Sequence, residues 1–573
     1  MPASHCTPRR TFAPRLLGTV CACLLAAALP CRALAQTPPD AGRLLEETRP
    51  PPRPALPPLT PPKLIDAPVR PAVTMPEGMT VMVSGFRISG AVSFPAEQLA
   101  ALVQPWAGRR LDIAGLNEAA GAITRHYQAA GQLLSYAYLP AQRVADGVIE
   151  IAVLEGRLGA VQIVSAQDVR LKDEVIQAHT EGLPDKPPLL QQDVERRLLL
   201  LNDIPGVAAS AAFTPGAAPG SADMVVSVAE DEPLAISAEF NNHGTRSTGE
   251  YRAGVNLQLR DLFGWGDSYT LRGMASNKGG LVSGSLAASL PVAGDGYRIG
   301  ANLSRLSYQL AGAFASLGAT GSADTLGVDG SWAALRSADT NATFKLGFDH
   351  KKLLDQTQLI GITHPKRDDV FSLTASFDRR DGWGGLNAGS ITGYAGFLKL
   401  LDATAVSDDA DPATGLHTQR AWRKVGAQFA RQQALGGPYS VYLRLAAQAS
   451  GGNLDSSEKF GLAGPYAVRA YAPGEASVDQ GGLASLELRY AQDYLGGSLL
   501  WSLFTDYAEG LVNRQPVVPG GNHLHLNGSG LAVQWNGGAV ALNASLAWRG
   551  RRMPTAEGGD PQPRVYLQLV VTP

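Results

Sequence analysis

Cysteine is confined to the first 31 positions of this 573-residue chain, at Cys6, Cys21, Cys23 and Cys31. This leading segment is typical of a secretory signal peptide, because basic residues precede an apolar run from 16 to 29 and small residues follow at 33 and 35. We therefore expect a signal peptide over residues 1–35. The rest of the chain then contains no thiol, which excludes disulfide bonds and cysteine-ligated metal sites.

Long hydrophobic runs are also missing after the leader. The apolar run inside the leader is itself shorter than the about 20 residues that a membrane-spanning helix needs, which disfavours a membrane anchor. The formal net charge is −2, so nothing indicates a nucleic-acid partner. A secreted chain with 64 glycines is then either soluble or crosses a membrane as a β-barrel, in which apolar outward residues alternate with polar inward ones.

Catalytic arrangements are missing too. The sequence shows no Ser/His/Asp or Cys/His arrangement, no paired carboxylates in a supporting context and no nucleotide-binding loop. His523 and His525 fall on one face of an expected strand, but a metal site would need a third ligand nearby. We therefore expect no enzyme activity, no catalytic residue, no metal site and no cofactor.

Proline dominates the segment that follows the leader. Residues 50–79 contain PPPRPALPPLTPPKLIDAPVRPAV, which predicts an extended linker that cannot pack a core. Ahead of it, residues 36–49 contain DAGRLLEETR, where Asp40 is a candidate N-cap for a helix of about three turns. Because so short a helix is marginal in water, we expect a larger structure to hold it.

Two consecutive segments, 80–155 and 156–232, repeat one order of elements: strand, helix, helix, strand, strand. In each segment one helix places apolar residues at helical spacing on one face. These residues are Leu116, Ala120, Ile123 and Tyr127 in the first segment and Leu190, Val194, Leu198 and Leu201 in the second. An internal repeat of this order predicts two small α+β domains.

From residue 233 to 573 the pattern changes to alternation with a period of two. In TNATFKLGFDH, for example, Phe344, Leu346 and Phe348 alternate with polar or small residues. A soluble β-sandwich also has one apolar face per strand and is the alternative interpretation. The size of the region and the charged residues on its polar faces favour a membrane barrel with a wet lumen, closed because lipid offers no partner to an unpaired strand edge.

Several stretches resemble the two-partner secretion transporters of the Omp85 superfamily, which include the haemolysin secretion/activation proteins and the filamentous-haemagglutinin exporters. GFRISGAVSFPAEQL and VIEIAVLEGRLGAVQI resemble parts of that family's two POTRA domains. GPYAVRAYAPGEAS resembles its sixth extracellular loop, and LFTDYAEG resembles its F-x-D-x-G strand motif. The resemblance follows the family's order and covers essentially the whole chain after the leader.

The resemblance implies an all-β transmembrane barrel of 16 antiparallel strands over residues 233–573, preceded by two α+β POTRA domains of βααββ order at 80–155 and 156–232. Sixteen strands leave about 21 residues for each strand with its connection, as expected for tilted membrane strands. The helix in 36–49 becomes a plug inside the barrel, tethered by the proline-rich linker. The implied location is the bacterial outer membrane, with the POTRA domains in the periplasm.

The resemblance further implies that the loop turns back into the lumen, where Arg469 meets Asp506 on the wall. A guanidinium in a partly desolvated lumen needs a carboxylate, and bidentate geometry would fix the register of the loop. A solvated surface pair that contributes little is the alternative. Glu475 is a second candidate partner. The other residues assigned to this contact are Val468, Ala470 and Tyr471 of the loop and Phe504 of the wall.

The chain departs from the family pattern at three points. Ala470 stands where the family favours glycine in the loop, and Ala508 replaces the last glycine of the strand motif. Alanine disfavours positive φ, so both departures bear on how tightly the backbone passes there. The chain ends in Pro573 and not in the aromatic residue common to outer-membrane proteins, which predicts an assembly signal that is either weaker or read further upstream.

The function implied by the resemblance is the export of a secreted exoprotein, which is recognised unfolded by the POTRA domains and passes through the barrel without ATP. An adhesin, a haemolysin and a contact-dependent toxin are the alternative partners. We expect docking by strand addition to an exposed edge or in a groove beside a helix. Candidate docking residues are Leu134, Tyr136 and Tyr138 in the first domain and Arg196, Arg197 and Leu198 in the second.

Further expected partners are outer-membrane lipid and the barrel-assembly machinery that inserts the chain itself. A barrel-assembly factor of the same superfamily is the alternative function. Such a factor usually has more than two POTRA domains and no plug helix on a proline tether. A passive porin lacks tandem POTRA domains, and a soluble adhesin would not be retained in the outer membrane.

Overall fold

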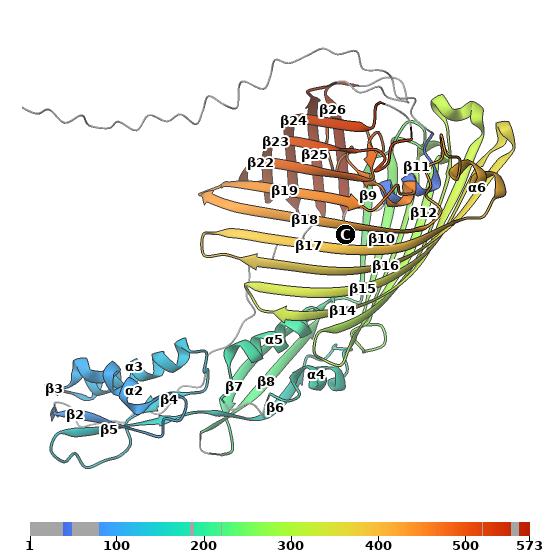
Figure 1. The fold of residues 1–573 in the computed structure, drawn as a ribbon. Helices are drawn as coiled ribbons and strands as arrows, with labels where there is room; N and C mark the ends of the chain where they lie inside the picture. The colour runs from blue at the N-terminus through green and yellow to red at the C-terminus, as the bar shows by residue number, and fades with distance from the viewer. Residues whose placement is uncertain (1–37, 49–78, 184–187, 219, 518–519, 552–560) are drawn as a thin grey trace, which may run out of the picture.

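A closed barrel and two small α+β units make up the fold in a computed structural model of the chain (Figure 1). The structure describes residues 38–48, 79–183, 188–218, 220–517, 520–551 and 561–573. The expected signal peptide (1–35) and almost all of the proline-rich linker (50–79) lie outside these residues. None of the helices in the described ranges combines the length and the hydrophobicity needed to cross a bilayer.

The barrel has sixteen antiparallel strands, which confirms the predicted architecture. It closes where the last strand pairs with the first, with Gln568 opposite Asn241 and Val571 opposite Ala238. The strands are β9 (Leu234–Asn241), β10 (Arg252–Arg260), β11 (Ser268–Ser276), β12 (Leu281–Val292), β13 (Tyr297–Gln309), β14 (Ala319–Arg336), β15 (Thr340–Thr357), β16 (Ile362–Arg380), β17 (Gly385–Leu400), β18 (Ala421–Gly436), β19 (Tyr439–Ser450), β22 (Gln480–Tyr494), β23 (Gly497–Leu511), β24 (His523–Gly537), β25 (Val540–Arg549) and β26 (Arg564–Val571).

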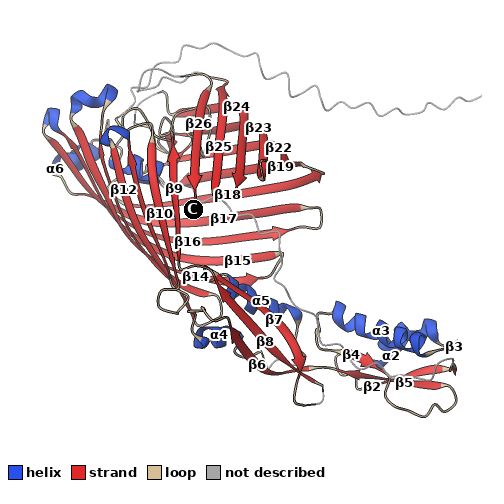
Figure 2. Ribbon diagram, turned by 180° about the vertical axis from the view of Figure 1, so that it is seen from behind, coloured by secondary structure: helices blue, strands red, loops and turns tan. Residues whose placement is uncertain are grey.

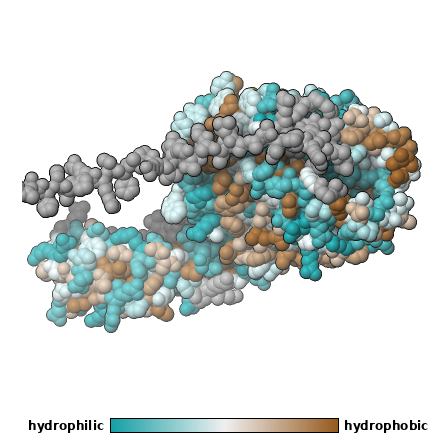
Figure 3. Space-filling model, turned by 45° about the horizontal axis from the view of Figure 1, so that its top comes forward, coloured by the Kyte–Doolittle hydropathy of each residue, from teal (hydrophilic) through white to brown (hydrophobic). Residues whose placement is uncertain are grey.

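Alternation along each strand separates an apolar outer face from a polar inner face. On β16, Phe371, Leu373 and Phe377 are exposed on the outside, while the serine and threonine between them face inward. Near the α+β units the outer face carries stacked aromatic rings: Tyr297 lies 5.8 Å from Trp332, measured between ring centroids. Aromatic residues of this kind mark the border of the apolar band of a membrane barrel. Figure 3 shows hydrophobic residues gathered over parts of the barrel and interrupted by hydrophilic ones.

The first α+β unit differs from its prediction in one respect. The expected first strand is split at Ser84, because β1 pairs with an additional short strand β3 and β2 pairs with β5. The remaining elements follow the expected order, and one cluster of buried apolar residues fills the space between helices and sheet. The elements are β1 (Val81–Val83), β2 (Gly85–Ser89), α2 (Ala96–Val103), η1 (Gln104–Trp106), β3 (Arg109–Leu111), α3 (Ile113–Ala129), β4 (Tyr136–Tyr138) and β5 (Val148–Leu154).

The second unit has the predicted order without additions. Its three-stranded sheet has the order β6-β8-β7, and the helices α4 and α5 pack on one face of it (Figure 2). Leu198 is 1 % exposed and belongs to this core. The elements are β6 (Arg157–Ser165), α4 (Asp173–Thr180), α5 (Gln191–Asn202), β7 (Val207–Pro215) and β8 (Ser221–Glu230).

The second unit is attached to the near end of the barrel by arginines. Arg196 on α5 donates to the carbonyl of Ala333 at 2.9 Å, and Arg197 pairs with the carboxylate of Asp295 at 2.6 Å. From the barrel, Arg336 on β14 donates to both carboxylate oxygens of Asp203, at 2.7 and 2.8 Å. These contacts join α5 and the residue after it to the turn between β12 and β13 and to the end of β14. They place the unit at the entrance of the bore.

A pair of carboxyl groups lies at the same junction. Asp261, in the turn after β10, is 1 % exposed and accepts a hydrogen bond from the backbone N–H of Gly266 at 2.7 Å. Burial, and then the neighbouring Glu230 carboxylate at the end of β8, raise the pKa of Asp261 to about 7. Arg170 offsets the charge of Glu230, with its guanidinium 3.3 Å from that carboxylate. The junction therefore contains an acid that keeps its proton near neutral pH.

Raising the pH should weaken this junction. The raised pKa of Asp261 means that the folded protein holds a proton that the unfolded chain releases near pH 4, so the stabilisation is complete below about pH 4 and is lost as the pH rises through about 7. Asp261→Asn should remove this dependence. Thermal unfolding of the α+β units in detergent, followed by circular dichroism from about pH 5 to about pH 9, checks it.

Asp231→Asn is the matched control, because the Asp231 side chain is 72 % exposed at the same junction. It should keep the pH dependence of the unmodified protein. If Asp261→Asn also kept the pH dependence of unfolding, the buried carboxyl of Asp261 would not be the source of that dependence.

Candidate functional site

One long connection at the far end of the barrel folds inward and fills part of the bore. It joins β19 to β22 over residues 451–479, and we call it loop 6 because it is the sixth connection at that end. Its short strands β20 (Phe460–Gly461) and β21 (Ser477–Val478) pair with each other. Val468 and Tyr471 are completely buried against the inner wall. Burial of such side chains stabilises the inward position by about 2 kcal/mol each.

Arg469 fixes loop 6 to the wall. Its Nε and Nη2 donate to the two carboxylate oxygens of Asp506 at 2.9 and 2.8 Å, and its backbone N–H donates to the same carboxylate at 3.1 Å. The guanidinium carbon lies 3.4 Å from the centroid of the Phe504 ring. The structure thus brings together the loop arginine and the two wall residues named from the sequence, in the bidentate geometry that specifies register.

A second carboxylate at this arginine was missed from the sequence. Glu487 on β22 accepts from Nη1 of Arg469 at 2.8 Å and is itself held by Arg489 at 2.7 Å. Ser485 donates to Asp506 at 2.7 Å. The signal was present: in GGLASLELRY the residues Ser485, Glu487 and Arg489 alternate, so they share the inner face of one strand.

The expected second partner of Arg469 has a local contact in the loop. The carboxylate of Glu475 accepts a hydrogen bond from the backbone N–H of Ala472 at 3.0 Å. Tyr471 donates its hydroxyl to the carbonyl of Arg551 at 2.8 Å, and its own carbonyl accepts from the Tyr566 hydroxyl at 2.7 Å. The buried tyrosine thus keeps its polar atoms satisfied, as such a position requires.

The two alanines that replace family glycines cause no backbone strain. Neither Ala470 nor Ala508 is among the described non-glycine residues with positive φ. Both are buried, and the methyl group of Ala470 lies so close to Gly528 on β24 that a Cβ added there would be 2.5 Å away. The close approach of loop and wall is therefore permitted by the glycine on the wall.

The helix α1 (Ala41–Thr48) lies inside the barrel beside loop 6. Asp40 caps it as predicted, accepting from the backbone N–H of Arg43 at 2.8 Å. One face of the helix is apolar and packs against residues of the inner wall. The packed residues are Ala41, Leu44 and Leu45 of the helix and Leu281, Leu306, Tyr308 and Leu353 of the wall. This contact supplies the larger structure that so short a helix needs.

A cluster of charges holds the first turn of α1. Lys366 on β16 lies 2.9 Å from the carboxylate of Asp455 in loop 6 and 3.8 Å from those of Asp40 and Asp355. Asp355 also accepts from the backbone N–H of Ala41 at 2.7 Å. One lysine therefore neutralises carboxylates from the plug helix, the wall and loop 6. The sequence did not indicate this cluster, because its members come from the cap of the plug helix, two strands of the wall and loop 6, which meet only in the folded barrel.

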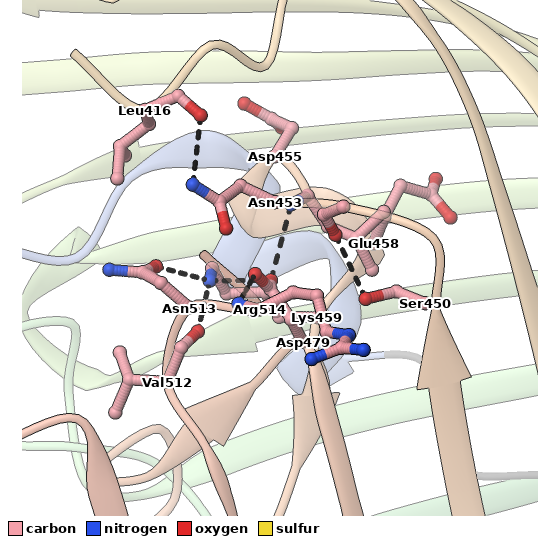
Figure 4. Close-up of polar contacts among 12 residues, drawn as sticks. Leu416, Ser450, Asn453, Asp455, Glu458, Lys459, Asp479, Val512, Asn513 and Arg514 are labelled. Atoms are coloured by element: carbon pink, nitrogen blue, oxygen red, sulfur yellow. Dashed lines mark hydrogen bonds and ion pairs between the residues drawn. The ribbon is translucent and has the colours of Figure 1, made fainter. Parts of the chain in front are cut away.

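The base of loop 6 is held by further lysines (Figure 4). Asp479, which is fully buried, accepts from Lys459 at 2.6 Å and from the backbone N–H of Arg514 at 2.8 Å. Glu458 pairs with Lys351 and, at 2.8 Å, with Lys424. These contacts tie loop 6 to the neighbouring connection and to the wall. Lys351, Lys424 and Lys459 each lie beside a carboxylate, as partial burial demands.

Two glycines let α1 and loop 6 approach each other. A Cβ on Gly42 would lie 2.5 Å from Oγ of Ser456 and 2.7 Å from the backbone nitrogen of Ser457. A Cβ on Gly474, whose φ is +71°, would lie 1.8 Å from a carboxylate oxygen of Glu47. Helix and loop therefore form one joined obstruction. The bore beside it retains a cavity of 1080 Å³ with many charged and polar lining residues.

Arg469→Ala should release loop 6 from the wall. The substitution leaves Asp506 and Glu487 without their shared cation, and breaking a buried ion pair from one side costs about 3–5 kcal/mol. We expect loop 6 to become sensitive to added protease on intact cells, while the barrel keeps its heat-dependent mobility in gels. Arg489→Ala is the control, because Arg489 contacts Glu487 from the wall. Equal protection of loop 6 in Arg469→Ala and the unmodified protein would contradict the assigned role.

Lys366→Met should destabilise the seating of α1. It removes the cation shared by Asp40, Asp355 and Asp455, so the three carboxylates repel one another. We expect the ion conductance of the purified protein in planar bilayers to rise, with an open fraction larger by about tenfold or more. Lys345→Met is the matched control, since Lys345 pairs with Asp329 on the inner wall. Unchanged conductance in Lys366→Met would refute this function of the cluster.

Comparison with known proteins identifies the family. The sequence model of the haemolysin secretion/activation proteins ShlB/FhaC/HecB matches residues 220–529, and that of the ShlB-type POTRA domain matches residues 81–156. The heme/hemopexin transporter protein HuxB of Haemophilus influenzae is 26% identical over 462 residues, which cover 79% of this chain and 80% of HuxB.

Solved structures share the fold. CdiB from Escherichia coli superposes with a TM-score of 0.67 at 20% sequence identity, covering 89% of this chain and 94% of CdiB. BamA from Haemophilus ducreyi, solved without POTRA domains 1–3, superposes with a TM-score of 0.51 at 15% identity, covering 86% and 99%. The family model spans more than half of this chain. The chain therefore belongs to the haemolysin secretion/activation (ShlB/FhaC/HecB) family of two-partner secretion transporters, with its barrel in the bacterial outer membrane and its POTRA domains in the periplasm.

Proposed function

We propose that this transporter exports one secreted exoprotein, which it recognises in unfolded form through its POTRA domains and passes through the barrel without ATP. HuxB and CdiB are both named as transporters, which supports transport rather than catalysis as the activity. The partner is a protein of the adhesin, haemolysin or contact-dependent toxin class. Its folding at the cell surface makes backward movement unfavourable and so gives transport its direction.

The observation that carries this proposal is the nature of the obstruction in the bore. Helix α1 is not a strand of the wall, and loop 6 contacts the wall through side chains, apart from backbone hydrogen bonds of its first and last residues, Gly451 and Asp479. Both can therefore leave without breaking a hydrogen bond between wall strands. The ion pairs of Lys366 and Arg469 become solvated when water enters, so their release is far less unfavourable than opening the barrel.

The POTRA domains supply surfaces for an extended chain. Tyr136 and Tyr138 on β4 have ring centroids 5.8 Å apart, and Tyr138 is 40% exposed. The outward N–H of Ala137 on this strand already donates to Thr124 at 3.0 Å, which disfavours backbone pairing there. We therefore assign side-chain recognition to the two tyrosines.

Backbone pairing is better suited to β7, an edge strand of the second POTRA sheet. The side chain of Asn202 covers its outer edge only at Ala209, with which it exchanges two hydrogen bonds of 2.5 and 3.1 Å. No described strand pairs with the rest of this edge, from residue 210 to 215. An incoming strand of the partner can add to it with little dependence on sequence.

The remaining candidate docking residues are occupied in this structure. Leu134 and Leu198 are 5 % and 1 % exposed in the core of the second POTRA unit. Arg196 and Arg197 bind carbonyl and carboxylate oxygens of the barrel turns. These four residues position the unit at the bore, and the docking proposal rests on Tyr136, Tyr138 and the edge of β7.

A reversible cross-link between the plug helix and loop 6 tests the proposal. The chain after residue 35 has no cysteine, and a Cβ on Gly42 would lie 3.0 Å from Cβ of Ser457, so a small shift brings the pair into disulfide range. Cells expressing Gly42→Cys with Ser457→Cys should release no partner into the medium until a reductant is added.

Each single-cysteine variant is a control for the substitution alone and should export normally. Full export by the cross-linked protein would show that the partner does not pass through a bore vacated by α1, and the proposal would be wrong.

A further inference from the structure

A row of mostly cationic side chains crosses the outside of the barrel near its extracellular end. On the neighbouring strands β13 to β17, five residues lie directly opposite one another in register. They are Arg305, Asp324, Lys352, Arg367 and Lys399, and we call them the outer row. Four of the five carry a positive charge, which is unusual for the lipid-facing side of a membrane barrel.

The alternation of each strand shows that the outer row faces outward. Leu306 and Leu353, the sequence neighbours of Arg305 and Lys352, face inward and pack in the cluster around α1. Successive side chains of a strand point to opposite faces, so Arg305 and Lys352 face away from the lumen. In agreement, the side chain of Arg305 is 72% exposed.

The row lies at the extracellular border of the apolar band. The opposite border is marked by stacked aromatic residues, with Trp332 between Tyr297 and Phe344 at centroid distances of 5.8 and 6.3 Å. On β15, the eight steps from Phe344 to Lys352 span about 26 Å along the strand and about 20 Å along the membrane normal at the usual tilt. This approaches the height of the apolar band, about 25 Å.

Two of the cations form no ion pair with any residue that the structure describes. Arg305 lies 3.4 Å from the carboxylate of Asp324, which is the acidic member of the row, and Arg367 lies 3.3 Å from the carboxylate of Asp369. Within the described residues, by contrast, no ion pair or side-chain hydrogen bond involves Lys352 or Lys399, and both are exposed. Asp324, which lies opposite Lys352 in register, is paired with Arg305, and a cation at the lipid boundary without an ion pair of its own favours an anion from the surroundings.

A hollow beside the row is suited to an acyl chain. It has a volume of 600 Å³ and is lined in part by Arg305 and Lys352, with Leu286, Leu303 and Leu326 beside them. The other side of the barrel is different: near the extracellular ends of β23 and β25 the outward positions carry Tyr507, Glu509 and Trp548. Cations beside an apolar hollow therefore distinguish the region around β13 to β15 from the region around β23 and β25.

We propose that the outer row binds the phosphorylated headgroup of an outer-leaflet glycolipid. Lys352 and Lys399 contact phosphate oxygens as point charges, Arg367 adds planar hydrogen bonding, and the hollow takes one acyl chain. The outer leaflet of a bacterial outer membrane presents such phosphates at the upper edge of its apolar layer, which is the height of the row. This site lies on the outside of the wall and does not depend on the transport proposal.

Binding of diphosphoryl lipid A to the full-length protein in detergent, measured by native mass spectrometry, tests the site. Lys352→Gln combined with Lys399→Gln should weaken binding about 25-fold, since each cation near a membrane surface contributes about fivefold. Arg379→Gln is the matched control, because Arg379 is an exposed arginine at the periplasmic end of β16, the strand that carries Arg367. It should bind as the unmodified protein does.

Two further probes identify the source of the phosphate. Lipid A without phosphates should bind at least tenfold more weakly than diphosphoryl lipid A, and inorganic phosphate should compete only weakly because it lacks acyl chains. Equal binding of the phosphate-free lipid, equally tight binding of inorganic phosphate, or an equal loss in Arg379→Gln would overturn the proposal. Should the double variant fail to fold, Lys352→Gln alone, expected to weaken binding about fivefold, provides the same test.

Discussion

The buried contact between the Arg469 guanidinium and the Asp506 carboxylate is the constraint on which the arrangement of the lumen depends. It fixes the register of loop 6 against the wall, and loop 6 in turn supplies Asp455 and Ser456 to the first turn of the plug helix. The helix has no such position without the loop. Because a buried ion pair contributes more to specificity than to net stability, this chain of contacts defines one closed state without making it permanent.

The two faces of a single strand show how the wall serves two environments. Lys351 and Lys352 are neighbours on β15 and point to opposite sides. Lys351 is almost fully buried with Glu458 and helps to hold loop 6, whereas Lys352 is exposed on the outside of the barrel. Which environment a residue meets is decided here by whether its position on the strand faces the lumen or the outside. Its chemical type is the same in both places.

The sequence predicted the parts of the fold that depend on local pattern. Alternation at Phe344, Leu346 and Phe348 indicated a strand with one apolar face, and the tandem helical repeats indicated two α+β units. The contact of Arg469 with Asp506 came from a family resemblance. Lys366 and its three carboxylates were not predictable, because Asp40 and Asp455 come from the cap of the plug helix and from loop 6, and strand register decides that Asp355 lies beside them.

The contacts of the POTRA residues Arg196 and Arg197 could not be predicted from the sequence either. Arg196 and Arg197 were expected to face a partner, since two arginines on a helix without a visible acceptor are normally solvated. Their acceptors are turns about 100 or more residues further along the chain, and only the docked position of the second unit reveals them. The split of the first strand at Ser84 has a similar origin, because the short strand β3 that pairs with β1 has no alternating pattern of its own.

The place where the barrel closes has a mechanical consequence. Only four opposed residue pairs join β26 to β9, while β14 and β15 are paired from Ala319 to Arg336. At this shortest joint, Tyr566 of β26 donates its hydroxyl to the carbonyl of Tyr471 in loop 6. Loop 6 is therefore also hydrogen-bonded to a strand of the shortest strand pairing in the barrel wall. In the proposed transport, release of loop 6 would remove this hydrogen bond from the joint between β26 and β9.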